Sequence, residues 1–77
     1  MVQQWRVVVH LRRFRQSLGM TQQDLADEVG VTRQTIISIE RGKYKPSIEL
    51  ALRLARVFNT TVESLFELSS VDGEAKS

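Results

Sequence analysis

The chain has 77 residues, of which 42% are hydrophobic and 26% charged, and these values predict one globular domain with a single small core. It contains no cysteine, which excludes a disulfide framework, a thiolate metal site and a thiol nucleophile, and its one histidine is too few for a metal site. The net charge is +2, and no apolar run approaches the roughly 20 residues of a membrane span or forms a secretory signal, so a cytoplasmic protein is expected.

The charges are unevenly distributed along the chain. Residues 1–46 contain eight basic and four acidic residues, a balance of +4, whereas residues 47–77 contain three and five, a balance of −2. An excess of positive charge on one part of a domain favours a polyanion such as nucleic acid as partner. An ordinary solvated surface explains the charge alone equally well, so the sequence pattern has to decide.

The N-terminal segment favours an extended conformation. Trp5 and the Val7-Val8-Val9 run are β-prone, which predicts an N-terminal arm over residues 1–7, although a valine run can also begin a buried helix. An extended arm in a protein this small needs a partner, which is either the C-terminal tail or a second subunit. The alternative is a frayed terminus.

Helical patterns occupy the rest of the chain. The expected helices span residues 8–18, 22–29, 33–41, 48–58 and 62–68. Residues that can cap a helix N-terminus precede four of them, namely Thr21, Thr32, Ser47 and Thr61. Residues that tolerate a left-handed conformation follow four of them, namely Gly19, Gly30, Gly42 and Asn59.

The stretch at residues 22–40 has the pattern of two short helices joined by a tight turn. The first helix has one apolar face, formed by Leu25, Ala26 and Val29. Gly30 then provides the φ > 0 conformation that a sharp turn between helices needs. The second helix has Ile36 and Ile39 on its inner face, which leaves three polar side chains outside, Arg33, Gln34 and Ser38. This pattern predicts a helix-turn-helix unit, whose second helix enters the major groove of DNA.

Five short helices with connections of a few residues predict an all-α domain over residues 8–68, followed by a flexible tail over residues 69–77. The short N-terminal arm is the one possible β element. The expected core is drawn from the inner face of each helix and comprises Leu11, Phe14, Leu18, Leu25, Ala26, Val29, Val31, Ile36, Ile39, Leu50, Leu54, Phe58, Val62 and Leu65.

On these residues the chain resembles the Cro and phage-repressor type of helix-turn-helix regulators, also called the XRE family, and most closely its small single-domain bacterial members. The residues that match at family spacing are Thr21-Gln22, Leu25-Ala26, Gly30-Val31-Thr32, Ile36, Ile39-Glu40 and Gly42-Lys43. The resemblance covers residues 8–68. It implies a five-helix lambda-repressor-like domain that binds operator DNA, usually as a two-fold dimer, to repress or activate transcription.

The resemblance also implies roles for individual residues. Positions that face base edges are matched by Arg33, Gln34 and Ser38. Ile37 stands where the family often has a polar residue, so it contacts either a thymine methyl group or the protein itself. Positions that often touch phosphate are matched by Gln22, Thr35, Arg41, Lys43 and Lys45. Glu40 matches an acid that commonly pairs with an arginine of the first helix, here Arg15.

The sequence therefore predicts a sequence-specific transcriptional regulator, a repressor in the simplest case, that binds an inverted-repeat operator as a homodimer. Exposed apolar residues near the chain ends predict the dimer interface, namely Trp5, Leu65, Phe66 and Leu68. The alternative is a protein-interaction module or antitoxin-like partner protein for which DNA binding is secondary. No enzyme, cofactor or metal is expected, because the sequence has no nucleophile–base pair and no glycine-rich phosphate loop.

Overall fold

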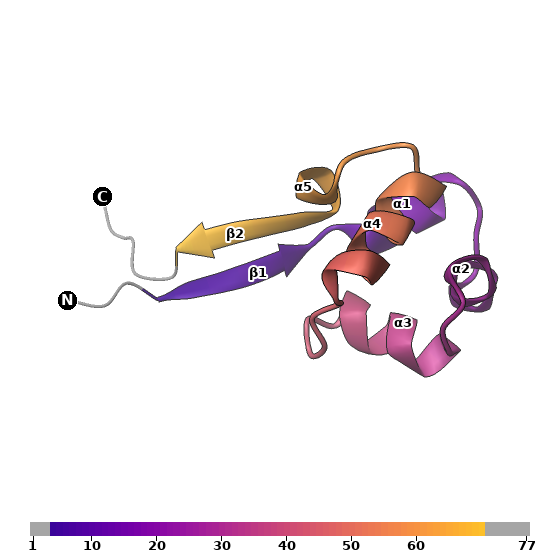
Figure 1. Cartoon of the computed structure of the whole chain (residues 1–77), viewed down its shortest axis with the longest axis horizontal. Coiled ribbons are helices and arrows are strands. Elements are labelled where there is room, and N and C mark those ends of the chain that lie inside the picture. The colour runs from indigo at the N-terminus through magenta and orange to yellow at the C-terminus, as the bar shows by residue number, and fades with distance from the viewer. Residues whose placement is uncertain (1–3, 71–77) are drawn as a thin grey trace.

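The computed structural model describes residues 4–70, which form a helical body and a two-stranded ribbon that projects from it (Figure 1). In chain order the elements are β1 (Trp5–Val9), α1 (Leu11–Ser17), α2 (Gln22–Val29), α3 (Arg33–Glu40), α4 (Ile48–Val57), α5 (Val62–Leu65) and β2 (Phe66–Ser70). The molecule measures 42 × 20 × 18 Å along its principal axes, and the ribbon accounts for this elongated shape.

The predicted helices are present in the described residues, but the fold is mostly helical rather than all-α. β1 continues to Val9, so α1 begins at Leu11 and not at residue 8. The fifth helix ends at Leu65 and not at residue 68, because the next residues form β2. The β-branched valines of residues 7–9 suit a strand, and pairing with a distant segment settles their conformation. The predicted tail begins as strand at residues 69–70, whereas residues 1–3 of the arm and 71–77 of the tail lie outside the described residues.

The two strands are antiparallel neighbours although they come from opposite ends of the chain. Trp5 lies opposite Ser70, and the register continues to Val9 opposite Phe66. The backbone N–H of His10 donates to the carbonyl of Leu65 at 2.8 Å, which extends the pairing to the start of α1. The sequence left two partners open for the N-terminal arm, the C-terminal tail and a second subunit. In the structure β1 of the arm pairs with β2 of the same chain. The alternative of a frayed terminus is wrong for residues 5–9.

The predicted N-caps are all formed. Each capping hydroxyl accepts the backbone N–H three residues further on, and the four residues are Thr21, Thr32, Ser47 and Thr61. At α2 the cap is reciprocal, since Asp24 also accepts the backbone N–H of Thr21 at 2.9 Å. These hydrogen bonds hold the pKa of the Asp24 carboxyl below its usual 3.8, mainly through the backbone N–H of Thr21 and then through the Thr21 hydroxyl.

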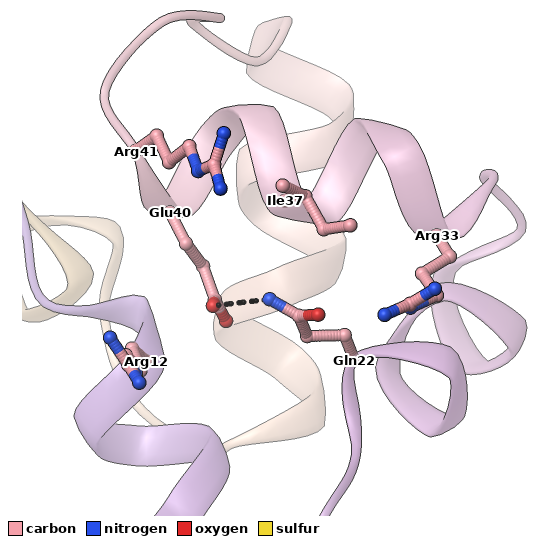
Figure 2. A pocket seen from close by; sticks show the side chains of 6 residues that line it. All are labelled: Arg12, Gln22, Arg33, Ile37, Glu40 and Arg41. Atoms are coloured by element: carbon pink, nitrogen blue, oxygen red, sulfur yellow. Dashed lines mark hydrogen bonds between the residues drawn. The ribbon is translucent and has the colours of Figure 1, made fainter.

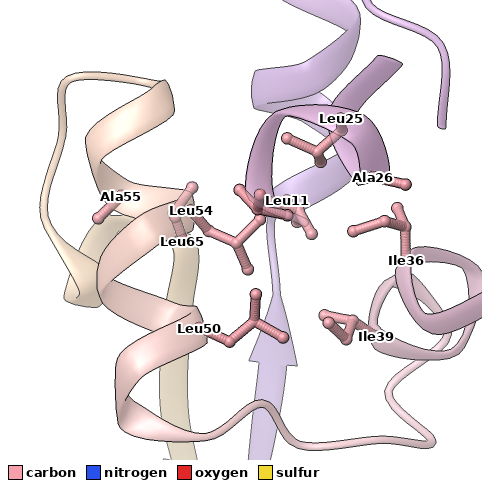
Figure 3. Close-up of a cluster of buried hydrophobic side chains, with 10 residues drawn as sticks. Leu11, Leu25, Ala26, Ile36, Ile39, Leu50, Leu54, Ala55 and Leu65 are labelled. Carbon is pink, nitrogen blue, oxygen red and sulfur yellow. The ribbon is translucent and has the colours of Figure 1, made fainter. Parts of the chain in front are cut away.

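The core lies between the helices (Figure 3). It consists of Leu11, Leu25, Ala26, Val29, Ile36, Ile39, Leu50, Leu54, Ala55 and Leu65, and the partly buried side chains that pack against it include Phe14, Val31, Phe58 and Val62. The prediction of Leu18 as a core residue is wrong. α1 ends one residue earlier, and the Leu18 side chain points to solvent from the C-cap position. No helix in residues 4–70 combines the length and the apolar character needed to cross a membrane.

Candidate nucleic-acid interface

The α2–α3 unit has the geometry that the sequence pattern predicts. Gly30 adopts a left-handed conformation with φ 76°, and its N–H and that of Val31 both donate to the carbonyl of Ala26, at 2.9 and 3.0 Å. Ala26 itself is fully buried, and its small side chain allows the two helices to approach closely. The buried Ile36 and Ile39 fix the rotation of α3, so Arg33, Gln34 and Ser38 face outward.

The outer face of α3 presents the three residues expected to read bases. Arg33 and Gln34 are exposed in the first turn of α3, and Ser38 is partly exposed one turn later. Gln34 and Ser38 line a shallow hollow of about 190 Å³ together with Tyr44 from the following loop. The polar tip of α3 therefore lies at the surface, where it can reach another molecule.

An ion-pair network lies beneath this face and joins three helices. The Arg15 Nε donates to Glu40 Oε2 at 2.7 Å, and the Arg15 Nη2 donates to Glu40 Oε1 at 3.2 Å, as the resemblance implied for this pair. Arg15 also donates to the carbonyl of Met20, and the amide of Gln22 donates to Glu40 Oε1 at 3.1 Å. Both charged side chains are almost fully buried, so the network fixes the last turn of α1 and the start of α2 against the end of α3.

Three arginines surround a pocket of about 300 Å³ next to the network (Figure 2). Arg12 comes from α1, Arg33 from the start of α3 and Arg41 from its C-cap. Because the Glu40 carboxylate is already paired with Arg15, the pocket has an excess of positive charge and suits an anion. Ile37 also lines this pocket and is half-buried there.

Neither the sequence pattern nor the family resemblance assigns Arg12 to the site. Arg12 precedes Arg15 by three residues on α1, so both lie on neighbouring parts of one helix surface, and this spacing was the available signal. What the spacing alone does not show is that α3 ends beside α1, which brings Arg41 to the same pocket. The described residues contain no group of three or more histidine, aspartate or glutamate side chains placed to hold a metal ion.

The loop after α3 carries the remaining expected phosphate contacts. Arg41, Lys43 and Lys45 are exposed. The loop backbone is fixed to α3, since the N–H of Lys43 donates to the carbonyl of Ser38 at 2.9 Å. Thr35 is partly exposed, and its hydroxyl lies 3.1 Å from that of Thr32 at the start of α3. The fixed backbone of the loop therefore holds these exposed cations close to the C-terminal end of α3.

Only some of the residues expected at a dimer interface are exposed at the surface of the chain. Trp5 and Leu68 are exposed on the ribbon, and Phe66 is partly exposed. Leu65, in contrast, is fully buried in the core of its own chain. It belongs to α5 at the point where the helix packs on the body, so the expectation that it contacts a second subunit is wrong.

The Helix-turn-helix family model, HTH_3, matches residues 11–65, which is most of the chain. The chain belongs to this family, as an XRE-type transcriptional regulator. An uncharacterized HTH-type transcriptional regulator from Archaeoglobus fulgidus is 55% identical over 56 residues, which cover 73% of this chain and 80% of that protein. The family match and this relative together identify a DNA-binding helix-turn-helix regulator.

Solved structures of other helix-turn-helix regulators have the same fold. The restriction-modification controller protein C.AhdI from Aeromonas hydrophila is 32% identical with a TM-score of 0.67, and the match covers 73% of this chain and 85% of that one. A chain from the complex of the SinR and SinI proteins is 26% identical with a TM-score of 0.66, and the match covers 84% of this chain and 59% of that one. SinR is a Bacillus subtilis protein with an N-terminal DNA-binding domain.

Proposed function

We propose that this XRE-type regulator is a repressor that binds an inverted-repeat operator as a homodimer, with α3 in the major groove. The observation that carries the proposal is the position of α3: its apolar side is held in the core, and Arg33 and Gln34 are exposed at its N-terminal end. A helix presented in this way fits the width of the major groove, where the edges of all four base pairs can be distinguished.

In this proposal, the exposed side chains of α3 contact the edges of the bases. The Arg33 guanidinium can donate two hydrogen bonds to a guanine, and the Gln34 amide can pair with an adenine. Ser38 is small enough to let the helix approach the base pairs closely. Ile37 lines the arginine pocket beside Arg33, and the exposed part of its side chain suits a thymine methyl group.

Phosphate contacts position the protein on the duplex without reading sequence. The expected contacts include the exposed loop cations Lys43 and Lys45 and the hydroxyl of Thr35. Arg12 and Arg41 line the positive pocket, and we assign Arg12 to the same role. Gln22 already donates one amide N–H to Glu40, which orients its side chain and leaves the second N–H for a phosphate oxygen.

Two copies related by a two-fold axis would place their α3 helices about 34 Å apart, so the two half-sites should be centred one helical turn apart. Selection of bound sequences from a random DNA pool tests binding, symmetry and spacing together. The expected result is an inverted repeat with this spacing. Recovery of unrelated sequences, bound as weakly as the starting pool, would overturn the proposal.

A second candidate is a module that binds another protein and contacts DNA secondarily. It is favoured by the exposed apolar side chains of the ribbon and by the match to a chain from a two-protein complex. Salt-dependent gel shifts with genomic fragments, set beside purification of bound proteins, separate the two. Tight stoichiometric capture of one protein without a DNA shift would favour the second candidate.

A further inference from the structure

The two faces of the β1–β2 ribbon differ sharply in character. Side chains alternate between the faces along a strand, and directly opposed residues of an antiparallel pair share a face. The register therefore places Arg6, Val8, Glu67 and Ser69 on one face. The other face carries Trp5, Val7, Val9, Phe66, Leu68 and Ser70, so all but one of its side chains are apolar.

The apolar face of the ribbon continues onto the helical body. Val7 and Phe66 line a hollow of about 240 Å³ together with Ile48 at the start of α4, and the other lining residues are apolar except Lys45. Leu52 follows Ile48 by four residues, so both lie on one side of α4. We call this continuous surface the apolar strip, and define it by Trp5, Val7, Ile48, Leu52, Phe66 and Leu68.

The apolar strip collects most of the large hydrophobic side chains that are exposed in the described part of the chain. Trp5 is 53% exposed, Ile48 80%, Leu52 57% and Leu68 61%. Only two other large hydrophobic residues within residues 4–70 are exposed to a similar degree, Leu18 and Tyr44, and neither belongs to the strip. This concentration of exposed apolar side chains on one surface requires an explanation.

The size of the strip fits a second copy of the chain. A large buried side chain covers on the order of 150–200 Å², so four that are more than half exposed present roughly 400 Å² of apolar area. A standard interface buries about 800 Å² on each partner, a little over half of it non-polar. The apolar strip therefore supplies about the apolar area that one side of a stable dimer needs.

Charge and strand stability also favour a second copy. In a two-fold interface the same surface meets itself, which an apolar strip can do without a differently charged partner. Arg56 and Glu63 line the hollow next to Leu52, so the rim carries both signs of charge and two copies can pair them. A two-stranded ribbon is marginally stable by itself in water, and its outer end projects away from the helices (Figure 1).

We propose that the second subunit packs on the apolar strip, ribbon against ribbon, with Trp5, Ile48 and Leu68 at the centre of the interface. The inference rests on the proposed homodimer and names the surface that forms it. The strip is formed by the ribbon and α4, whereas the reading face is formed by α3, so dimerisation leaves Arg33 and Gln34 exposed. Lys45 lies at the border of the strip, which places one expected phosphate contact next to the junction of the subunits.

The test compares two leucines that are equally exposed but lie on different surfaces. Leu68→Asp places a charge in the strip, and Leu18→Asp places the same charge outside it, at a residue that is 58% exposed. Analytical ultracentrifugation of the full 77-residue chain should show a wild-type dimer. We expect Leu68→Asp to raise the dimer Kd by about 100-fold or more, since the change occurs twice in a two-fold interface. Leu18→Asp should leave the Kd unchanged.

Trp5 provides an internal reporter because it is the only tryptophan of the chain. On dilution of the wild type, its emission should shift to longer wavelength at the concentration where sedimentation shows dissociation. Ile48→Asp is a second disruptive variant, at a residue so exposed in the single chain that its folding should not change. Equal dimerisation of wild type, Leu68→Asp and Ile48→Asp would overturn the inference. A monomeric wild type would also overturn it, and so would loss of the dimer in the Leu18→Asp control.

Measurements of DNA binding distinguish an incorrect dimer interface from an incorrect proposed function. If the strip forms the dimer, Leu68→Asp should keep the base preference of one half-site and lose the gain in affinity that the inverted repeat provides. A wild type that dimerises through the strip but selects no DNA sequence would refute the proposed function alone. A wild type that selects a single half-site and remains monomeric would refute the interface alone.

Discussion

The α2–α3 unit and the β ribbon expose side chains of opposite character. In α2–α3 the large apolar side chains are turned into the core, and the exposed tip is polar, with Arg33 and Gln34. In the ribbon the apolar side chains of one face stay at the surface, among them Trp5 and Leu68. The first surface suits a polar, charged ligand, and the second suits another protein. The following changes test how separate these two surfaces are.

The largest expected effect is on the support beneath the reading face. Glu40→Ala leaves the buried guanidinium of Arg15 without its partner, which should lower the free energy of unfolding by about 3–5 kcal/mol. Urea denaturation followed by circular dichroism measures this loss. Glu49→Ala is the matched control, because Glu49 pairs with Arg53 at 2.6 Å on the exposed side of α4. An exposed pair of this spacing contributes only about 0.3–0.5 kcal/mol, so equal losses would contradict the assigned role of the network.

The next effect is on base reading. Arg33→Ala should cost about 1–3 kcal/mol of binding free energy on the selected operator and relax the preference at one base pair. Titration of the operator and of point-substituted versions by fluorescence anisotropy measures both quantities. The variant should remain dimeric, since Arg33 lies outside the apolar strip. Unchanged preference at every base pair would remove Arg33 from the reading face.

A smaller and less specific effect is expected at the arginine pocket. Arg12→Ala should weaken binding to operator and random DNA alike, and it should reduce the salt dependence by about one counterion per subunit. The neighbouring Arg13→Ala is the control, because Arg13 lies outside the pocket and contacts His10 instead. Salt titrations of both variants on both DNAs measure the slopes. Identical slopes for Arg12→Ala and Arg13→Ala would show that the pocket holds no phosphate.

The smallest effect concerns the N-terminus of α2. The pKa of Asp24 is lowered in the folded protein, so its ionised form stabilises the fold at pH values above the ordinary carboxyl range. This contribution is lost as the pH falls through the folded pKa. The stability difference between wild type and Asp24→Asn should therefore be constant near neutral pH and shrink below about pH 4. Thermal unfolding from pH 7 to pH 2 measures it, and a difference that does not change with pH would contradict the cap's role.

The two regions also differ in how far the sequence predicts them. The α2–α3 unit follows from local signals, since a cap such as Thr21, a turn residue such as Gly30 and the buried Ile36 act within a few positions of each other. The ribbon depends on a pairing between residues 5–9 and 66–70, which no local pattern specifies. For that reason the expected first helix began too early and the expected fifth helix ended too late.

The same distinction applies to the candidate site. The exposed positions of α3 could be identified from helical periodicity, and the resemblance to a known family gave them roles. The pocket at Arg12 could not be predicted, because it depends on how α1 docks against the end of α3. Leu65 was misjudged as a contact for a second subunit because its burial depends on the packing of the whole body.

The distance along the chain between β1 and β2 has a consequence for the order of assembly. During translation, residues 5–9 leave the ribosome long before the segment that pairs with them has been synthesised. The helices between them rely on nearby contacts and can dock first, whereas closing the ribbon requires the longest loop in the fold. We therefore expect newly made chains to carry an unpaired, valine-rich strand until residues 66–70 have been synthesised, and to gain their partner subunit only after that strand has been paired.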